Sequence, residues 1–312
     1  MMQKILLIPS NLGLNPLYEG DIPGTYRAPS VLMQQGLDKC FSAFEIVTVP
    51  CPEYSPESEP GTDILNGHKL RQLNLNLADE VEAALRCNLK PVVIGGDCAI
   101  LPGALLGCRR QLGNLALVHI DGHSDFRHPG NWKRGHGDRP GAAAGMDLAL
   151  VTGRGEPLLT KWPGIDGPLV EDKAVIQLGE RESLLEDYEW PDIAETEILR
   201  ITVFDALKLQ DSQLVNLINE RLDDFPAMPY WIHLDLDVRD SDEMPAVDCP
   251  GKPGLSSQRL VNVCRTLFNH SRCCGISVTI YDPDLDADRN IAKRVVDMIR
   301  SITQESAHCP NN

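Results

Sequence analysis

Three short polar runs in this chain each follow an apolar stretch that predicts a buried strand. In two of these runs the polar residues alternate, with one residue between each pair, so an extended chain would point them to one side. The residues of the three runs that could bind a metal are Cys98, Asp121, His123, Asp125, Asp235 and Asp237. Together these four carboxylates, one imidazole and one thiolate are enough ligands for two divalent ions.

Buried carboxylates need a compensating cation. A carboxylate that emerges from an apolar strand is costly when unpaired, and the three runs, taken as far as Cys98, Asp125 and Asp237, contain no lysine or arginine. A metal pair would supply that charge and would lower the pKa of a trapped water, so that hydroxide forms near neutral pH. Taken alone, an Asp-x-Asp after a strand is more often a helix cap or turn former, and Cys98 could be a plain buried thiol. The joint pattern on separate strands favours metal-assisted hydrolysis.

The elements that must position these residues alternate between strand and helix. Near-continuous apolar runs predict strands over residues 4–8, 44–49, 91–94, 115–120, 174–178, 230–235 and 275–280. Helical spacing predicts helices over residues 73–86, 100–112, 212–222, 256–269 and 290–302. This alternation predicts an α/β fold whose parallel sheet is covered on both faces. With no repeat or linker, we expect one domain over residues 1–312, with its ligands at the carboxyl ends of the strands.

The composition excludes several classes of partner. The chain has 312 residues, 29 of them basic and 45 acidic, and a net charge of −16. That charge opposes binding to nucleic acid or an anionic membrane surface, so we expect a small-molecule partner. The apolar runs are shorter than a membrane span and the N-terminus lacks a signal-peptide layout, which predicts a cytoplasmic protein. Neither Gly-x-Gly-x-x-Gly nor a P-loop follows the first strand, which argues against a Rossmann oxidoreductase.

The three polar runs resemble the signatures of one enzyme family. They read Gly95-Gly96-Asp97-Cys98, Asp121-Gly122-His123-Ser124-Asp125 and Asp235-Leu236-Asp237-Val238-Arg239-Asp240. In this order they are similar to Gly-Gly-Asp-His, Asp-Ala-His-x-Asp and Asp-x-Asp-x-x-Asp of the arginase, agmatinase and formiminoglutamase (ureohydrolase) family. The resemblance implies a single three-layer αβα domain with a mainly parallel sheet of about eight strands. It also implies a homo-oligomer, trimer or hexamer, that hydrolyses a carbon–nitrogen bond in a guanidino or amidino group.

The resemblance also implies two divalent metal ions, which are manganese in the family. The first ion would be bound by Cys98, Asp121, Asp125 and Asp235. The second would be bound by Asp121, His123, Asp235 and Asp237, so that Asp121 and Asp235 bridge the ions. A hydroxide held between the ions would attack a trigonal carbon, and Asp125 could hydrogen-bond that hydroxide and pass its proton.

The first departure from the family pattern is Cys98, which stands where the family has a histidine ligand. Two divalent ions carry four positive charges and four carboxylates cancel them, so a thiolate makes the shell net negative and water deprotonation harder. Sulfur is also softer than imidazole. It favours zinc, cobalt or nickel over manganese, unless the thiol stays protonated and the first site is weak or empty.

The second departure is Ile280, which stands where the family has a glutamate that pairs with the substrate guanidinium. An isoleucine cannot neutralise or hydrogen-bond a cation, so a guanidinium would lose a charge-assisted contact. Arginine and agmatine are therefore expected to be poor substrates, and a formimino, ureido or amide compound better ones. Asp282, two residues further on, could take over the role of the missing glutamate.

The third departure is Ala144, where the family has a histidine. His128 or His136 could replace it as a proton shuttle, although loop histidines are more often merely solvated. Nearby Arg127 would suit a substrate with a carboxylate tail. The candidate substrate-binding residues are Arg127, Asn131, Asp147, Ile280 and Asp282.

Two functions follow from these residues. The first is a metal-dependent hydrolase of a carbon–nitrogen bond in a small polar substrate, which the retained metal ligands favour. The second is a catalytically impaired family member that binds a ligand or stabilises an oligomer, which Ile280 and Cys98 keep open. Metal analysis would discriminate between them.

Overall fold

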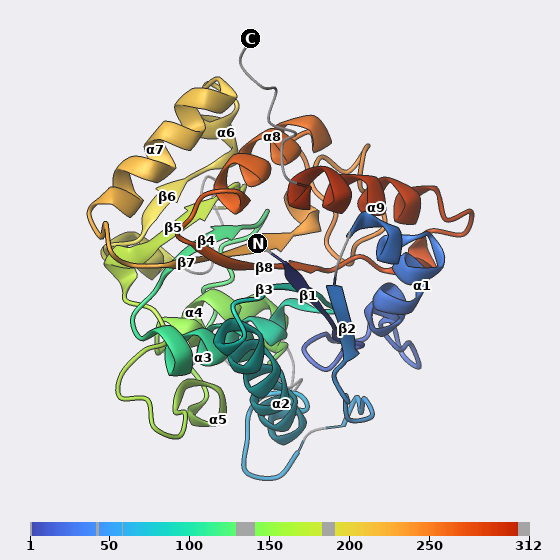
Figure 1. Cartoon of the computed structure of the whole chain (residues 1–312). Coiled ribbons are helices and arrows are strands. Elements are labelled where there is room, and N and C mark those ends of the chain that lie inside the picture. The colour runs from blue at the N-terminus through green and yellow to red at the C-terminus, as the bar shows by residue number, and fades with distance from the viewer. Residues whose placement is uncertain (1, 42–43, 58, 129–140, 183–190, 305–312) are drawn as a thin grey trace.

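The computed structural model describes residues 2–41, 44–57, 59–128, 141–182 and 191–304. One parallel sheet runs through the molecule, with its eight strands in the order β2-β1-β3-β8-β7-β4-β5-β6 (Figure 1). The strands are β1 (Gln3–Leu7), β2 (Phe44–Thr48), β3 (Lys90–Ile94), β4 (Ala116–Ile120), β5 (Val175–Leu178), β6 (Leu199–Ile201), β7 (Tyr230–Asp235) and β8 (Cys273–Thr279). The predicted parallel α/β fold is confirmed.

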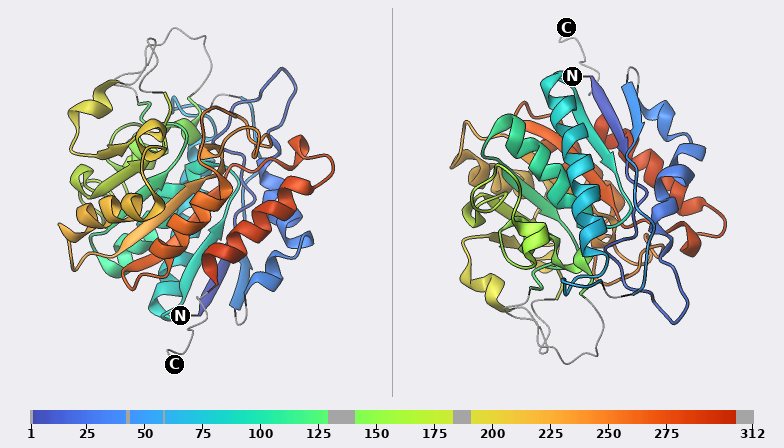
Figure 2. Two further views of the ribbon diagram at one scale, coloured as in Figure 1. Left: turned by 90° about the horizontal axis from the view of Figure 1, so that it is seen from above. Right: turned by 90° about the horizontal axis from the view of Figure 1, so that it is seen from below.

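Helices cover both faces of the sheet and make the molecule three layers thick (Figure 2). One face carries α2 (Gly67–Arg86), α3 (Leu101–Leu112), α4 (Asp147–Val151) and α5 (Pro157–Thr160), which contact one another in sequence. The other face carries α1 (Ala28–Gln34), α7 (Asp211–Asp223), α8 (Ser257–Phe268) and α9 (Asn290–Thr303), with α6 (Val203–Ala206) before α7. None of the described helices is long and apolar enough to cross a membrane.

The central strands are apolar along their whole length because both of their faces are covered. Every residue of β3, β4, β7 and β8 is buried. In α2 the buried positions follow helical spacing, from Leu70 through Leu73 and Leu77 to Val81. This stripe packs against α3, where Gly103 lies so close to α2 that an added Cβ would stand 2.7 Å from the carbonyl oxygen of Asn74.

The structure differs from the sequence prediction mainly at short elements. The edge strand β6 was not predicted, because it has only three residues and two of them are half-buried. Helix α2 begins at Gly67, six residues before the predicted start at 73, because Leu70 already contributes to its apolar stripe. The one-turn and two-turn helices α1, α4, α5 and α6 are too short to show a clear period in the sequence.

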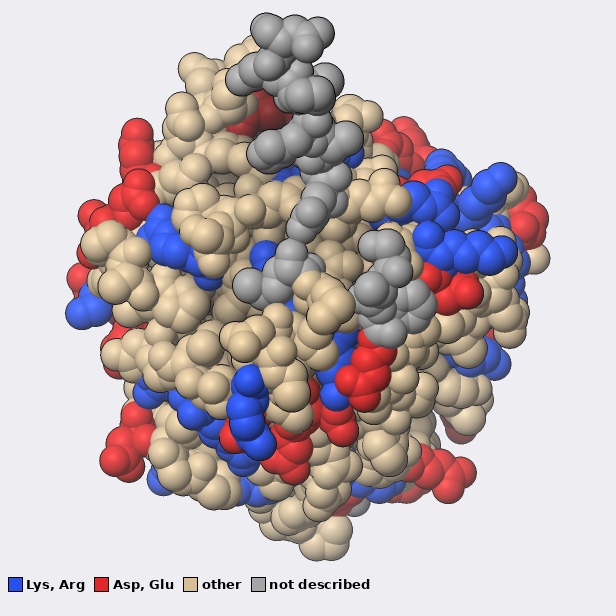
Figure 3. Space-filling model, viewed as in Figure 1, with Lys and Arg blue, Asp and Glu red and all other residues tan. Residues whose placement is uncertain are grey.

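The surface carries charges of both signs. On the face viewed in Figure 3, lysines and arginines are interspersed with aspartates and glutamates. Charged side chains of the described residues pair locally in several places, such as Arg110 with Asp79 at 2.8 Å and Arg154 with Asp172 at 2.7 Å. This mixed surface fits the expectation, drawn from the net charge, that the partner is a small molecule rather than a polyanion.

Candidate metal centre

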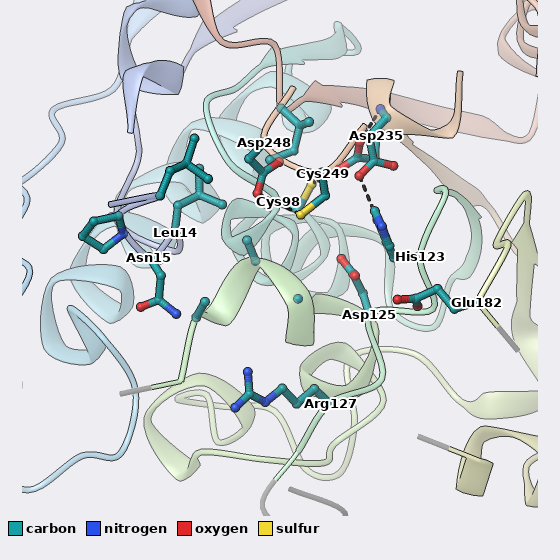
Figure 4. A pocket seen from close by; sticks show the side chains of 17 residues that line it. Leu14, Asn15, Cys98, His123, Asp125, Arg127, Glu182, Asp235, Asp248 and Cys249 are labelled. Carbon is teal, nitrogen blue, oxygen red and sulfur yellow. Dashed lines mark hydrogen bonds and ion pairs between the residues drawn. The ribbon is translucent and has the colours of Figure 1, made fainter. Parts of the chain in front are cut away.

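The strand order brings the three polar runs together. Strands β3, β8, β7 and β4 are neighbours and run in one direction, so their carboxyl ends meet at one edge of the sheet. A cavity of about 380 Å³ opens there (Figure 4). Its wall includes Cys98, His123, Asp125, Asp235 and Asp237. The predicted convergence of these side chains is therefore present in the fold.

The loop after β3 places Cys98 at the cavity, and at Gly96 this loop lies directly against the backbone of Ser10. A Cβ at Gly96 would lie 1.8 Å from the carbonyl oxygen of Ser10, so only glycine fits there. Asp97 then accepts a hydrogen bond from the backbone N–H of Ala99 at 2.9 Å and caps the short helix that begins at Cys98. Because Asp97 faces its own turn and Ser10, Cys98 is the residue of this loop that reaches the cavity.

The run after β4 turns sharply toward the cavity. Oδ1 of Asp121 accepts a hydrogen bond from the backbone N–H of His123 at 2.6 Å, which fixes the Asp-x-His turn. Asp125 has a φ of 46°, in the left-handed region that non-glycine residues rarely adopt. The sequence analysis assumed an extended chain over this run, but the backbone turns at Asp125. Ligand atoms of Asp121, His123 and Asp125 nonetheless lie within 4.8 Å of one another.

The run after β7 completes the wall. Oδ1 of Asp235 accepts a hydrogen bond from the backbone N–H of Asp237 at 2.6 Å, which repeats the turn seen at Asp121. Oδ2 of Asp237 lies 2.8 Å from Nδ1 of His123 and so joins the ends of β4 and β7. The thiol of Cys98 donates to Oδ2 of Asp235 at 2.8 Å. All three strand ends are thus in direct contact.

The carboxylates of this wall repel one another. Burial and then the charges of Asp237 and Asp121 raise the pKa of Asp235 well above its ordinary value. Burial and then the charge of Asp121 do the same to the pKa of Asp125. At Asp237 burial acts in the same direction, but the contact with His123 outweighs it and lowers the pKa. Without a further cation, the cluster holds more negative charge than its histidine can offset.

These residues fit divalent cations. Cys98, Asp121 and Asp235 offer one group of ligand atoms within 4.8 Å, and Asp121, His123 and Asp125 offer a second. Asp121 belongs to both groups, as expected for a bridging ligand. Its Oδ2 is buried and has no hydrogen-bond partner among the described residues, so a ligand position is left unused. An oxygen-rich set with one imidazole and one thiol suits manganese, zinc, cobalt or nickel.

Two of the predicted substrate-binding residues line the cavity. Arg127 does so on the side away from the carboxylate wall, and it is the only lysine or arginine among the described lining residues (Figure 4). Ile280 lines the cavity just after β8 with a φ of 75°, and its N–H donates to the carbonyl oxygen of Gly96 at 2.7 Å. A β-branched residue in the left-handed region is strained, and such strain is often found at functional sites.

Other predicted residues lie elsewhere. Nε2 of His128 lies 2.7 Å from Oδ2 of Asp192, and His128 is not part of the cavity lining. Asp282 accepts hydrogen bonds from the N–H groups of Gly24 and Asp284 and is also absent from the lining, so it does not take the place of the missing glutamate in the described cavity. Asp147 is buried below the cavity against two histidines. The predictions for Asn131 and His136 lie outside the described residues.

Sequence reasoning missed two acidic residues in the lining. Glu182 follows β5 and accepts hydrogen bonds from Ser124, so the strand-end signal used for the other runs would have found it. Asp248 comes from the loop after β7, next to Cys249, and had no such signal. Burial, and then the charge of Asp237, raises the pKa of Asp248 to about 6. Both residues add negative charge to the wall opposite Arg127.

Comparisons with known proteins agree with this geometry. The family model described as Arginase family matches residues 22–304. An arginase of Bacillus subtilis strain 168 is 26% identical over 246 residues, covering 77% of this chain and 79% of that protein. The arginase structure from Bacillus caldovelox has a TM-score of 0.84 at 22% identity and covers 98% of this chain and 100% of that chain. The formimidoylglutamase structure from Bacillus subtilis has a TM-score of 0.72 at 16% identity, covering 97% and 86%. This chain therefore belongs to the arginase family, whose enzymes hydrolyse carbon–nitrogen bonds in guanidino or amidino groups.

Proposed function

We propose that this protein is a metal-dependent hydrolase that acts on a non-peptide carbon–nitrogen bond of a small polar molecule. The observation that carries the proposal is the pair of ligand groups that share Asp121 and whose other members all line the cavity. One group adds Cys98 and Asp235, and the other adds His123 and Asp125. When bound, two divalent ions would supply the positive charge that lowers the pKa of a water and polarises the group under attack.

One residue of the cavity is placed to accept and donate the proton that hydrolysis transfers. Asp125 lines the cavity, and its carboxylate lies beside the other ligand atoms of the group formed with Asp121 and His123. It can therefore accept a proton from an attacking water and donate it to the departing nitrogen. His128 is held against Asp192, outside the cavity lining, so Asp125 is the better candidate.

The lining favours a substrate whose reacting group carries little positive charge. Ile280 offers no charge at the position where the family pattern has a glutamate. A guanidinium beside Ile280 would lack the charge-assisted contact that this glutamate supplies, and the loss of such a contact costs about 1.5–3 kcal/mol. Arg127 lies across the cavity and could pair with a carboxylate tail. A formimino, ureido or amide compound with an acidic end is therefore the proposed substrate class.

Metal content and turnover should be measured together. Purified protein is analysed for metal, then assayed for urea and ammonia release from a panel of guanidino, formimino, ureido and amide compounds. We expect Asp121→Asn to lose both ions and more than about 100-fold of the activity, because it removes the shared ligand. Asp242→Asn is the matched control, since Asp242 is an exposed aspartate that pairs with Lys252.

Two outcomes would count against this function. Metal-loaded protein that hydrolyses none of the panel would favour an impaired family member that binds a ligand or supports an oligomer. Protein that takes up no manganese, zinc, cobalt or nickel at saturating concentration would reject the metal pair itself. If Asp121→Asn loses both ions as expected but its turnover is unchanged, hydrolysis does not depend on this site.

We further propose that the protein works in the cytoplasm as a homo-oligomer, a trimer or a hexamer. The family resemblance supports the oligomer, and the free thiols of the described cysteines are usual in a reducing compartment. Sedimentation of the purified protein would measure the mass directly against the 34.4 kDa of one chain. A stable monomer over a wide concentration range would reject the oligomer.

A further inference from the structure

A row of buried polar side chains crosses the sheet below the cavity. Its members are neighbours on adjacent strands: Gln177 pairs with His119, His119 with His233, and His233 with Ser277. All four are 0% exposed. Since side chains alternate between the faces of a strand, the two histidines face the same side as the metal-wall carboxylates two residues further along. His119 and His233 therefore form a second layer of possible metal ligands, further from the cavity than Asp121 and Asp235.

Asp147 faces this layer from α4. Its Oδ1 lies 3.0 Å from Nε2 of His119, and its Oδ2 lies 3.2 Å from Nε2 of His233. Within the described structure, Oδ2 of Asp147 and Nε2 of His233 contact each other at 3.2 Å, but neither makes a hydrogen bond, although both residues are fully buried. Buried polar atoms are rarely left without partners, because each one loses its hydration. These two atoms are therefore placed so that both could bind one cation.

Cys98 completes a group of three. Its Sγ and the ligand atoms of Asp147 and His233 all lie within 4.8 Å of one another. Sulfur, imidazole nitrogen and carboxylate oxygen are the donors that zinc and cobalt accept. The 3.2 Å between the histidine nitrogen and the aspartate oxygen is close to the edge of about 3.3 Å that zinc bonds of about 2.0–2.1 Å give in a tetrahedron.

We propose that Cys98, Asp147 and His233 form a separate site for a divalent ion of the zinc type, below the predicted metal pair. His119 is a positioning residue, because its contact with Oδ1 turns Oδ2 of Asp147 toward His233. Ser277 holds the other nitrogen of the His233 ring at 2.8 Å. Asp147 and His233 are thus each held in orientation by a neighbouring side chain, as the ligands of many metal sites are.

The charges balance under this assignment. One thiolate and the Asp147 carboxylate cancel one divalent ion, to which His233 would bind as a neutral imidazole. The four carboxylate ligands of the predicted pair, Asp121, Asp125, Asp235 and Asp237, then cancel its two ions. Buried charges are tolerated when they are compensated in this way, whereas adding the thiolate to the upper shell would leave it net negative. Cys98 also contacts Asp235 at 2.8 Å, so membership of the upper pair is the competing assignment. When Cys98 serves the lower site, Asp121, Asp125 and Asp235 remain for the first ion of the upper pair.

Cobalt separates the two assignments, because a thiolate bound to Co²⁺ gives a charge-transfer absorption in the near ultraviolet. Full-length protein is stripped with a chelator and titrated with Co²⁺ alone. We expect this band in the wild type, its loss in Cys98→Ser, and at least tenfold weaker binding in His233→Gln and Asp147→Asn. Cys249→Ser, which changes the other thiol of the cavity, and His123→Gln, which changes the upper pair, should keep the band.

Other results would overturn the proposal. A wild type without the band contradicts it, and so does a band that survives in His233→Gln and Asp147→Asn but disappears in Asp125→Asn. If a variant does not fold, as judged by circular dichroism, X-ray absorption of zinc-loaded wild type decides instead: sulfur and imidazole bound to one zinc support the site, and an oxygen-only shell rejects it. Because these readouts do not involve turnover, a protein with the band and no hydrolysis would reject only the proposed function.

Discussion

Ile280 is the residue on which the substrate class depends. It is 3% exposed and lines the cavity with a left-handed backbone, so its apolar side chain occupies a position that the fold holds firmly. The carbonyl oxygen of Gly96 fixes its N–H. We therefore expect a different side chain at this position to face the cavity from the same backbone, so that a substitution changes only the chemistry of the lining.

Ile280→Glu should raise kcat/KM for arginine and agmatine by about 10-fold or more relative to the wild type. The new carboxylate would pair with the guanidinium and offset its desolvation, and a charged hydrogen bond contributes about 1.5–3 kcal/mol. The measurement is a comparison of kcat/KM across cationic and neutral substrates, with Ile280→Gln as the uncharged control of similar size. Wild-type protein that already hydrolyses arginine or agmatine at about 10⁴ M⁻¹s⁻¹ would contradict this interpretation of position 280.

At the scale of elements, the contact between α2 and α3 supports the loop that delivers Cys98. Asn74 of α2 donates to the carbonyl oxygen of Ala99 at 2.9 Å, and its Oδ1 accepts from the N–H of Gly103 at 2.6 Å. These bonds tie the first turn after Cys98 to the buried face of α2. The close approach depends on Gly103, because a side chain there would strike the α2 backbone.

Gly103→Ala should lower the free energy of unfolding by about 1–3 kcal/mol, the usual cost of overpacking. In an open helix the same change would be stabilising, so the sign itself is informative. Gly145→Ala is the control, since no atom lies within 4 Å of its added Cβ, and its effect should be smaller. Urea unfolding of both variants in saturating metal measures the difference, and a stabilised Gly103→Ala would show that the helices can separate at little cost.

At the scale of the whole molecule, the buried carboxylates make stability depend on pH and metal together. Burial, countered in part by His119, raises the pKa of Asp147 from 3.8 to about 6. The pKa values of Asp125 and Asp235 are raised as well. The folded, metal-free protein therefore binds these protons more tightly than the unfolded chain does. Their contribution is complete below pH 3.8 and is lost as pH rises through the folded-state values.

Metal-free protein should accordingly lose stability between about pH 4 and about pH 7, by on the order of 3 kcal/mol for a group such as Asp147. Divalent ions replace the protons, so metal-loaded protein should not follow this decline, and the gap in Tm between the two forms should widen as pH rises. Thermal melts in chelator and in saturating manganese or zinc measure both curves. A gap that narrows with rising pH would contradict the assignment of these carboxylates as metal ligands.

The sequence by itself determined the parallel α/β fold, because apolar runs and helical spacing alternate along the chain. It also determined which strand ends carry ligand-type residues, since polar residues directly after a buried strand must lie at one edge of a parallel sheet. Cys98, Asp121 and Asp235 come together for that reason. What it could not reveal were elements with too few residues to show a period, such as β6.

Only the tertiary structure decided which residues share a cavity and which lie below it. Ile280 and Asp282 are the first and third residues after β8, yet the side chain of Asp282 accepts a hydrogen bond from the N–H of Gly24 while Ile280 lines the cavity. His119 and His233 lie inside apolar strands, where a single sequence gives no sign that they face each other or Asp147. Strand register and the left-handed turns after β4 and β8 set these contacts, and both depend on packing between segments far apart in the chain.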